Sequence, residues 1–431
     1  MAALYFASFW CILFTGAVRK WIFPHVAILY LFQDVPITAA YLYALWSGLF
    51  TRGLILVGSL LLSVILVLQG LFQVINSTNT VLVAIVGFHH YLYYLPMLVV
   101  FPLCLTEKYR RDFIRWNMWL SLPMTLLVIA QALSPKNAFV NRTSEGDAFG
   151  LPGVEVARVS GTFNFVAFFA IWISTAMALC LGEWLLPKNR RVIQSTWLLS
   201  ACTFGLVLSS LISGSRSIIL LVVIALLGAL LAAGMLGSGR SIAAILGFCL
   251  LLPVAGAATY FISPVEFSTL RDRLTGESGA AEGKSRVINI FYTWITEPKF
   301  SLIGAGIGMG VDASHFGNVN SYNFTYELSE QDIVRNVMEL GTPVGLTYVS
   351  LRIGFLFGVF FLAVRIVRSG TSPHVIPLSF ILFAQGMQDF TRAATMTSTQ
   401  VMIGCVYILG AQLYPDQHSL QDQGFEHPGQ I

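Results

Sequence analysis

Apolar residues dominate the chain in long runs that short polar segments separate. Most runs approach the roughly 20 residues that an α-helix needs to cross a bilayer. We expect about twelve membrane-spanning helices, near residues 1–18, 27–50, 53–73, 81–104, 117–133, 162–186, 193–212, 217–236, 241–262, 337–364, 374–389 and 396–414. The pattern therefore predicts an all-α polytopic membrane protein.

The composition agrees with this prediction. Of 431 residues, 56% are hydrophobic and only 11% are charged, whereas soluble proteins carry about 25% charged residues. The first 17 residues lack the basic N-terminal region and the small-residue cleavage site of a signal peptide, so we interpret them as a membrane span. The six cysteines lie in apolar runs and form no C-x-x-C pair, which argues against a disulfide framework and a zinc site.

Short basic loops predict the orientation in the membrane. Four short loops are basic: "EKYRRDFIR" (107–115), "PKNRR" (187–191), "GSGR" (237–240) and "VRIVRSG" (364–370). Such loops face the cytoplasm in most membrane proteins. With twelve spans all four fall on one side, together with Arg52, and both chain termini are then cytoplasmic.

Two long polar segments, 134–161 and 263–336, fall on the opposite side. Loops of this length are usually functional. We divide the chain accordingly into a first set of membrane helices (1–262), an extracytoplasmic loop carrying part of a site (263–336), the last membrane helices (337–414) and a cytoplasmic tail (415–431). Within the loop, glycines alternate in "GAGIGMG" (304–310), which would let backbone approach helix ends or a ligand closely.

Arg216 begins the eighth predicted span at its outer end. A cation there opposes the helix dipole, whereas the free N–H groups of a first helical turn favour anions. Together they predict a site for a phosphate or a carboxylate. The alternative is that Arg216 reaches lipid phosphates or pairs with a carboxylate.

Other ionisable residues border or enter the predicted spans, where such groups are costly and often functional. Arg19 also lies outside, against the positive-inside rule, although the neighbouring Trp21 would suit lipid anchoring. His89 and His90 lie within the fourth span, where hydrogen-bonded packing is the alternative to a functional role. Four further residues are expected to have structural partners. Asp389 would pair with Arg392, and Asp34 and Arg352 would each pair with another buried polar group.

Four stretches, in this order, resemble the O-antigen ligase and Wzy-type polysaccharide polymerase superfamily. The stretches are "RVSGTFNFVAFFA" (158–170), "SGSRSIILL" (213–221), "R…W…EP…IGAGIG" (286–308) and "E…R…ELGTPVGL" (330–346). The N-terminal "RKWIFP" and "YYLP" are similar to its exopolysaccharide branch. The resemblance extends from residue 19 to about 410 and implies a GT-C-like fold.

The resemblance implies an enzyme of the bacterial inner membrane. Its donor would be a saccharide on undecaprenyl diphosphate, and its acceptor a saccharide or lipid hydroxyl on the periplasmic face, with no metal or other cofactor. Membrane lipids and other polysaccharide-assembly proteins are the further partners implied, and we expect no nucleic-acid partner. By the same resemblance Arg216 and Arg286 hold the diphosphate, and ligases carry a histidine near the position of Glu330.

The implied chemistry suits the residues. A diphosphate leaving group gains negative charge as the glycosidic bond breaks, and preorganised arginines stabilise it. We therefore add Arg335 to the diphosphate site, with Arg158 as a secondary candidate. The acceptor hydroxyl needs a base within hydrogen-bond reach, and Glu330 is the first candidate. The absence of a ligase-type histidine favours a polymerase over a ligase.

Two other functions fit the same sequence. A lipid-linked oligosaccharide flippase or polysaccharide exporter would also have many spans with intramembrane polar residues. A non-catalytic subunit of a polysaccharide synthase is the third possibility. The unusual charges gather on one face beside a long loop, rather than at the membrane midplane, and this favours the enzyme.

Overall fold

A computed structural model describes residues 1–24, 26–50, 53–76, 78–144, 157–237, 239–275, 301–310, 332–388 and 395–416. These residues form helices joined by turns, which confirms the predicted all-α class. The α-helices are α1 (Ala2–Ala17), α2 (Asp34–Trp46), α3 (Leu54–Ile75), α4 (Val81–Leu92), α5 (Met97–Val100), α6 (Glu107–Leu133), α7 (Val166–Leu185), α8 (Thr196–Ile212), α9 (Arg216–Met235), α10 (Gly239–Ile262), α11 (Pro264–Thr275), α13 (Asp332–Leu340), α14 (Thr342–Arg368), α15 (Val375–Gln388) and α16 (Thr395–Leu413).

Short helices of other types connect these elements. A π-helical turn, Val18–Ile22, continues α1. The others are 3₁₀-helices, at Ala27–Gln33, Pro102–Cys104, Phe139–Asn141 and Lys188–Arg190. The stretch Ala27–Gln33 runs directly into α2, so together they form one continuous helical segment.

The described helices include nine that are long and apolar enough to cross a membrane. They are Ala2–Ile22, Ile28–Trp46, Leu54–Ile75, Val81–Cys104, Glu107–Leu133, Val166–Leu185, Arg216–Met235, Thr342–Arg368 and Met396–Leu413. Three shorter apolar helices, Thr196–Ile212, Gly247–Ile262 and Val375–Gln388, coincide with the other predicted runs. The structure thus confirms a polytopic helical membrane protein, while twelve crossings stay a prediction.

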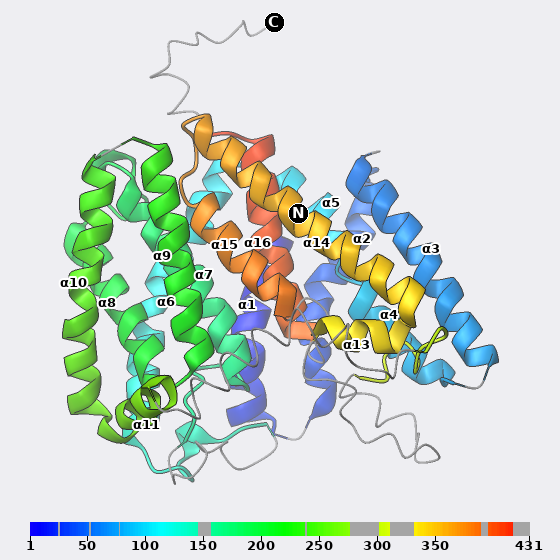
Figure 1. Ribbon diagram of the computed structural model, residues 1–431, viewed down its shortest axis with the longest axis horizontal. Coiled ribbons are helices and arrows are strands. Elements are labelled where there is room, and N and C mark those ends of the chain that lie inside the picture. The colour runs from blue at the N-terminus through cyan, green and yellow to red at the C-terminus, as the bar shows by residue number, and fades with distance from the viewer. Residues whose placement is uncertain are drawn as a thin grey trace, which may run out of the picture.

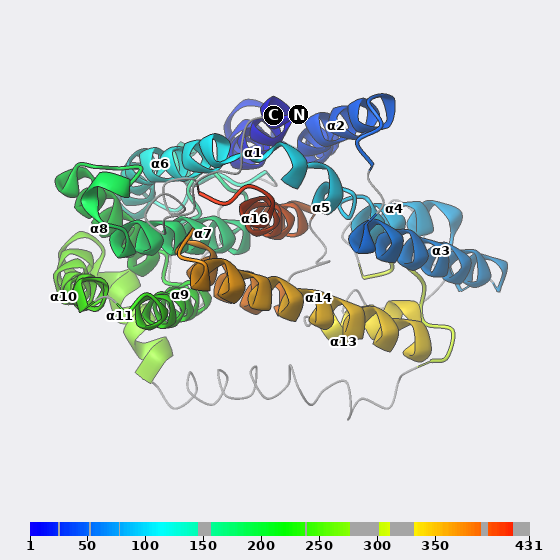
Figure 2. The same ribbon diagram turned by 90° about the horizontal axis from the view of Figure 1, so that it is seen from above.

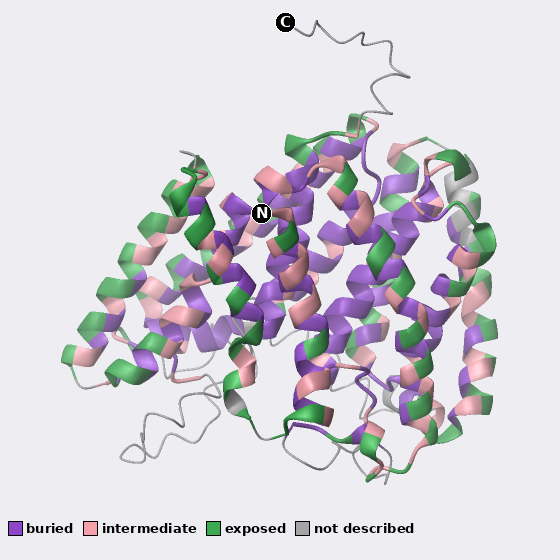
Figure 3. Ribbon diagram, turned by 180° about the vertical axis from the view of Figure 1, so that it is seen from behind, coloured by how far each residue is buried: buried purple, intermediate pink, exposed green. Residues whose placement is uncertain are grey.

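Helix α7 forms the centre of the fold. In its most apolar window 94% of the residues are buried, and it packs against α6, α8, α9, α10, α15 and α16. Helix α3 is the opposite case, with 11% of its window buried, and Figure 2 shows it at the edge of the molecule. Figure 3 shows the same gradient, with buried residues concentrated in the central helices and exposed ones on the outer helices.

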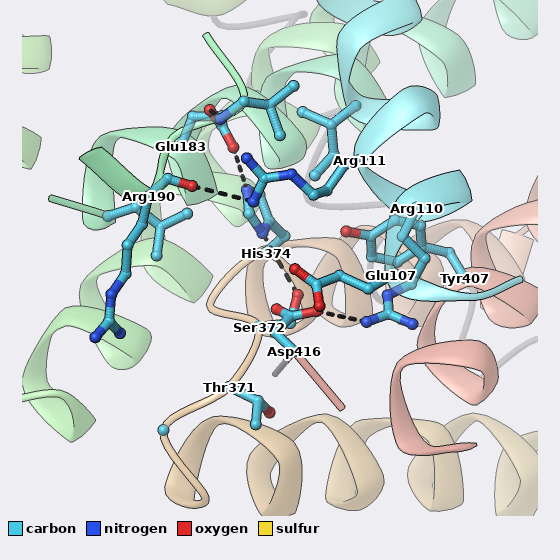
Figure 4. Close-up of a pocket in the computed structure, with 14 residues that line it drawn as sticks. Glu107, Arg110, Arg111, Glu183, Arg190, Thr371, Ser372, His374, Tyr407 and Asp416 are labelled. Atoms are coloured by element: carbon cyan, nitrogen blue, oxygen red, sulfur yellow. Dashed lines mark hydrogen bonds and ion pairs between the residues drawn. The ribbon is translucent and has the colours of Figure 1, made fainter. Parts of the chain in front are cut away.

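Three of the four basic segments meet at one end of the helix bundle, and the segment 107–115, predicted as a loop, forms the start of α6. A small pocket there is lined by residues of the start of α6, the 187–191 loop, the turn after α14 and the C-terminal segment (Figure 4). Arg110 ties the segments together, since it donates to the carbonyl of Gly410 and pairs with Asp416 at 2.5 Å. This shared end agrees with the predicted topology, and its placement in the cytoplasm stays a prediction.

Candidate functional site

The predicted site residues that the structure describes lie toward the other end of the bundle. Gly182 of α7 contacts His374, and Gly228 of α9 contacts Pro377, so the C-terminal halves of both helices adjoin the start of α15. Their N-terminal ends therefore point away from the basic loops, toward the end where α1 finishes and α11 lies (Figure 1). Arg216, the first residue of α9, lies at this end.

Arg19 and Lys20 are buried beside the segment 158–164, and we call this arrangement the cationic site. The two side chains belong to residues that are 4% and 3% exposed. Lys20 Nζ donates to Ser160 Oγ at 2.8 Å and to the carbonyl of Gly161 at 3.1 Å. The structure thereby joins two distant sequence motifs, "VRKWIFP" and "RVSGTFNF".

Arg19 is held by an aromatic ring and an amide. Its guanidinium carbon lies 3.5 Å from the centre of the Tyr30 ring, a cation–π contact. The Asn164 amide, oriented so that its nitrogen donates to the carbonyl of Gly16, accepts from Arg19 Nη1 at 3.0 Å. Both partners are neutral, so neither balances the charge of Arg19.

Gln131 and two glycines fix the segment that Lys20 contacts. The Gln131 side chain donates to the carbonyls of Val140 and Gly161 and accepts from the N–H of Ser160 and Gly161. Gly161 has φ +57°, which favours glycine. A Cβ on Gly16 would lie 2.3 Å from the carbonyl oxygen of Thr162, so only glycine lets α1 approach this closely.

The cationic site has no carboxylate partner among the residues that the structure describes. Their contacts with the described residues are to a hydroxyl, carbonyls, an amide and aromatic rings. Removing a charge from water costs several kcal/mol unless another charge or good hydrogen bonds compensate. Two adjacent, buried and unbalanced cations therefore favour an anionic ligand.

Arg158 and Arg216 extend the positive charge at this end. Both residues are half-buried. Arg158 lies two positions before Ser160, on the segment that Lys20 contacts, and Arg216 follows a turn in which Gly214 has φ +60°. Because α7 and α9 pack side by side, Arg216 and the start of α7 share one end of the bundle.

Arg335 lies instead in a network of opposite charges, which we call the α13 network. Asp332 pairs through one oxygen with Arg335 and through the other with Arg352 Nη1 at 2.5 Å. Arg335 also lies 3.8 Å from Glu339. These four residues are at most 5% exposed, and their two cations balance their two carboxylates. The expected pairing of Arg352 with a buried polar group is confirmed.

Glu339 anchors the glycine-rich stretch to α13. It accepts the Tyr91 hydroxyl at 2.8 Å and the backbone N–H groups of Gly308 at 3.2 Å and Gly310 at 2.7 Å. Burial raises the pKa of the Glu339 carboxyl, while Arg335 and these donors oppose the shift. Gly308 has φ +86°, and a Cβ there would lie 2.4 Å from the carbonyl oxygen of Val83. The expected close backbone approach is confirmed.

Two glutamines of α3 hold the other side of the glycine-rich stretch. Gln69 donates to the carbonyls of Ile303 and Leu340, and Gln73 donates to those of Ile303 and Glu339. Gln73 also accepts the backbone N–H of Ile307. The stretch is thus clamped between α3 and α13 by hydrogen bonds.

The structure does not place Arg216 beside Arg335. Helices α9 and α13 both contact α15, and Figure 1 shows them on opposite sides of it. The third predicted diphosphate ligand, Arg286, lies outside the described residues, as do Glu330, Asp389 and Arg392. The diphosphate role of Arg335 and the catalytic role of Glu330 stay predictions.

His89 forms a pair with Asp34. Its Nε2 lies 2.9 Å from Asp34 Oδ2, and the Tyr94 hydroxyl donates to Asp34 Oδ1 at 2.7 Å. The expected pairing of Asp34 with other buried polar groups is therefore confirmed. His90 is 6% exposed, and its ring meets that of His89 edge to face.

A second carboxylate–histidine pair lies at the end with the basic loops. Glu183 and His374 Nε2 are 2.9 Å apart, and Glu183 also accepts from the N–H groups of Val192 and Ile193. The adjoining pocket has a volume of about 40 Å³, and Figure 4 shows this pair and the Arg110–Asp416 pair lining it. Both pairs fasten loops to helix ends, which indicates a structural role.

Sequence reasoning missed Lys20 as a binding residue, and also Gln131 and Asn164. Nothing near Lys20 in the sequence indicates its partner Ser160, which lies 140 positions away. Gln131 did carry a signal, since it is a polar residue near the end of an apolar run. No family model, curated protein or solved structure matches the chain.

Proposed function

We propose that this protein is an integral membrane glycosyltransferase that polymerises or ligates polysaccharide units. It transfers a saccharide from undecaprenyl diphosphate to an acceptor hydroxyl on the periplasmic face of the bacterial inner membrane, and the cationic site holds the diphosphate. One observation carries the proposal: Arg19 and Lys20 are buried without a carboxylate partner among the described residues.

The cationic site has donors left for a phosphate. An ammonium has three N–H groups, and Lys20 directs two donor contacts to Ser160 and Gly161. Arg19 Nε has no hydrogen-bond partner among the described residues. Arginine can bind phosphate oxygens in pairs, and lysine adds a point charge. The position suits a polyprenyl lipid, because these residues lie in the last turn of the candidate membrane span Ala2–Ile22.

The chemistry follows from charge development at the leaving group. As the bond between the anomeric carbon and the phosphate oxygen breaks, negative charge grows on the diphosphate. Cations already fixed in a buried site stabilise this charge without reorganising. Arg158 and Arg216, at the same end, would lower the potential energy of the diphosphate further, and no metal ion or nucleotide cofactor is needed for this step.

The test is transfer by the full-length protein in proteoliposomes that contain an oligosaccharide on a polyprenyl diphosphate. We expect longer or transferred saccharide, and a rate about 100-fold lower in Arg19→Gln or Lys20→Met. Arg271→Gln is the matched control, since Arg271 lies on α11 with its side chain 65% exposed. It should retain wild-type activity, because its guanidinium is solvated.

Two results would contradict the proposal. One is movement of the lipid across the bilayer without any change in the saccharide, which would identify a flippase. The other is transfer at an unchanged rate in both Arg19→Gln and Lys20→Met. Size-exclusion profiles of the variants show whether each remains folded.

A further inference from the structure

We infer that the Asp34–His89 pair supplies the general base of the proposed transfer, with His89 Nδ1 accepting the proton of the acceptor hydroxyl. This inference rests on the proposed function. Glu330 was the first candidate from the sequence, whereas the geometry of the described residues points to His89.

The pair is arranged so that one nitrogen of His89 is fixed. Asp34 Oδ2 lies 2.9 Å from His89 Nε2, and Asp34 Oδ1 accepts the Tyr94 hydroxyl. An ionised carboxylate can only accept, so the Nε2 atom carries the proton of the neutral ring. The Tyr93 ring stacks on His89 at 4.8 Å between centroids and holds the plane of the imidazole.

The other nitrogen of His89 is available to a substrate. With the proton on Nε2, the Nδ1 atom has a free lone pair, and it makes no hydrogen bond to the residues that the structure describes. The His89 side chain is 23% exposed, whereas that of Asp34 is only 10% exposed. A buried carboxylate that orients an accessible imidazole is the arrangement that base catalysis uses in hydrolases and transferases.

One segment positions both the base and the cationic site. Arg19 lies over the ring of Tyr30, in the stretch Ala27–Gln33, and Asp34 follows that stretch directly. The stretch also packs against α1, which continues into the π-helical turn that carries Arg19 and Lys20. Figure 2 shows α1 and α2 as neighbours. One short segment would thus position both the cations that bind the leaving group and the base that serves the acceptor.

The step balances in atoms and charge. The acceptor oxygen forms a bond to the anomeric carbon while its proton passes to His89 Nδ1. The bond between the anomeric carbon and the phosphate oxygen breaks, and its electron pair leaves with the polyprenyl diphosphate on the cationic site. Asp34 stabilises the imidazolium that forms, and the proton then returns to solvent or to the released diphosphate.

A structural ion pair is the competing explanation, and this chain contains an internal control for it. Glu183 and His374 form a pair with the same 2.9 Å separation at the opposite end of the bundle. His374→Gln removes a buried histidine from a carboxylate just as His89→Gln does. If pairing alone mattered, the two variants would behave alike.

The experiment measures the pH dependence of kcat in proteoliposomes containing the full-length protein and the lipid-linked oligosaccharide. In His89→Gln we expect kcat to fall about 100-fold, with little change in KM for the donor, and the loss of rate toward low pH to disappear. Asp34→Asn should also lower kcat. His374→Gln should keep both the wild-type kcat and the shape of the profile in its folded fraction.

Other outcomes overturn the inference. The titratable groups around His89 are Asp34, His90, Tyr93 and Tyr94. If His89→Gln keeps its kcat, or keeps the low-pH loss of rate, one of them or a group elsewhere is the base. If the wild-type protein forms no product, the proposed function itself is wrong. If product formation depends on Arg19 but not on His89, only the assignment of His89 as the base is wrong.

Discussion

The cationic site and the α13 network are two buried groups of charges that differ in how they are balanced. In the α13 network, Asp332 and Glu339 face Arg335 and Arg352, so the charges cancel within the chain. In the cationic site, Arg19 and Lys20 face hydroxyl, carbonyl, amide and aromatic groups.

The difference separates a structural role from a binding role. A buried ion pair contributes little net stability, but removing one partner is costly because the other charge stays buried. A cation without such a partner already bears most of that cost. An anionic ligand that binds there therefore offsets this desolvation cost. In the α13 network, the carboxylates of the chain itself already offset it.

The largest effect is expected from Asp332→Ala, which leaves Arg335 and Arg352 without their shared carboxylate. We expect the free energy of unfolding to fall by about 3–5 kcal/mol. Chemical unfolding in detergent micelles, followed by tryptophan fluorescence, measures it. Adding Arg335→Met should restore part of the loss, because one buried cation is removed. A double variant no more stable than Asp332→Ala would show that the pairing does not matter.

The second effect concerns the cationic site, where a ligand should stabilise the protein. A short-chain polyprenyl diphosphate at 100 times its Kd should raise the free energy of unfolding by about 2.7 kcal/mol. The corresponding polyprenol, which lacks the phosphates, should have little effect. Inorganic pyrophosphate serves as the comparison ligand: stabilisation by pyrophosphate alone would indicate a site for free phosphates rather than for a lipid headgroup. Equal stabilisation of wild type and Lys20→Met would contradict the assignment of the site.

Tyr91→Phe removes one hydroxyl donor, which lies within hydrogen-bond distance of both Glu339 and Asn336. Hydrogen bonds to charged groups contribute about 1.5–3 kcal/mol, so we expect a loss of about 2 kcal/mol. Thermal unfolding of the purified variant measures it. Tyr91 lies two positions from His89 on α4, but its hydroxyl contacts Asn336 and Glu339 rather than His89 or Asp34, so the activity per folded molecule should be unchanged. A large loss of activity in a folded variant would give this network a functional role.

The smallest effect is expected from Arg271→Gln. Arg271 pairs with Asp272 at 3.2 Å, but both side chains are about two-thirds exposed. Exposed pairs of this kind contribute about 1 kcal/mol or less. The free energy of unfolding should therefore change by less than about 0.5 kcal/mol. A larger change would mean that burial is not what distinguishes the sites compared above.

The sequence predicted the helices well because membrane crossing depends on local length and apolarity. It also predicted the close approach at Gly308, since alternating glycines have few other uses in such a loop. Arg335 and Glu339 lie four positions apart on α13, so their proximity follows from local helix geometry. The contact of Lys20 with Ser160 was not, because it joins residues 140 positions apart. Whether a buried cation has a partner depends on such contacts, so the cationic site required the structure.

The hydrogen bonds of Gln69 and Gln73 have a consequence for how the protein responds to the thickness of the surrounding bilayer. Between membrane helices there is little hydrophobic driving force, because lipid tails are as apolar as leucine side chains. Helix α3, largely exposed, is attached at its polar end through these two amides. A bilayer thicker or thinner than α3 would change the tilt of this helix and strain its hydrogen bonds. A change in bilayer thickness alone would thus weaken the hydrogen bonds that hold the glycine-rich stretch to α3, without any change in sequence.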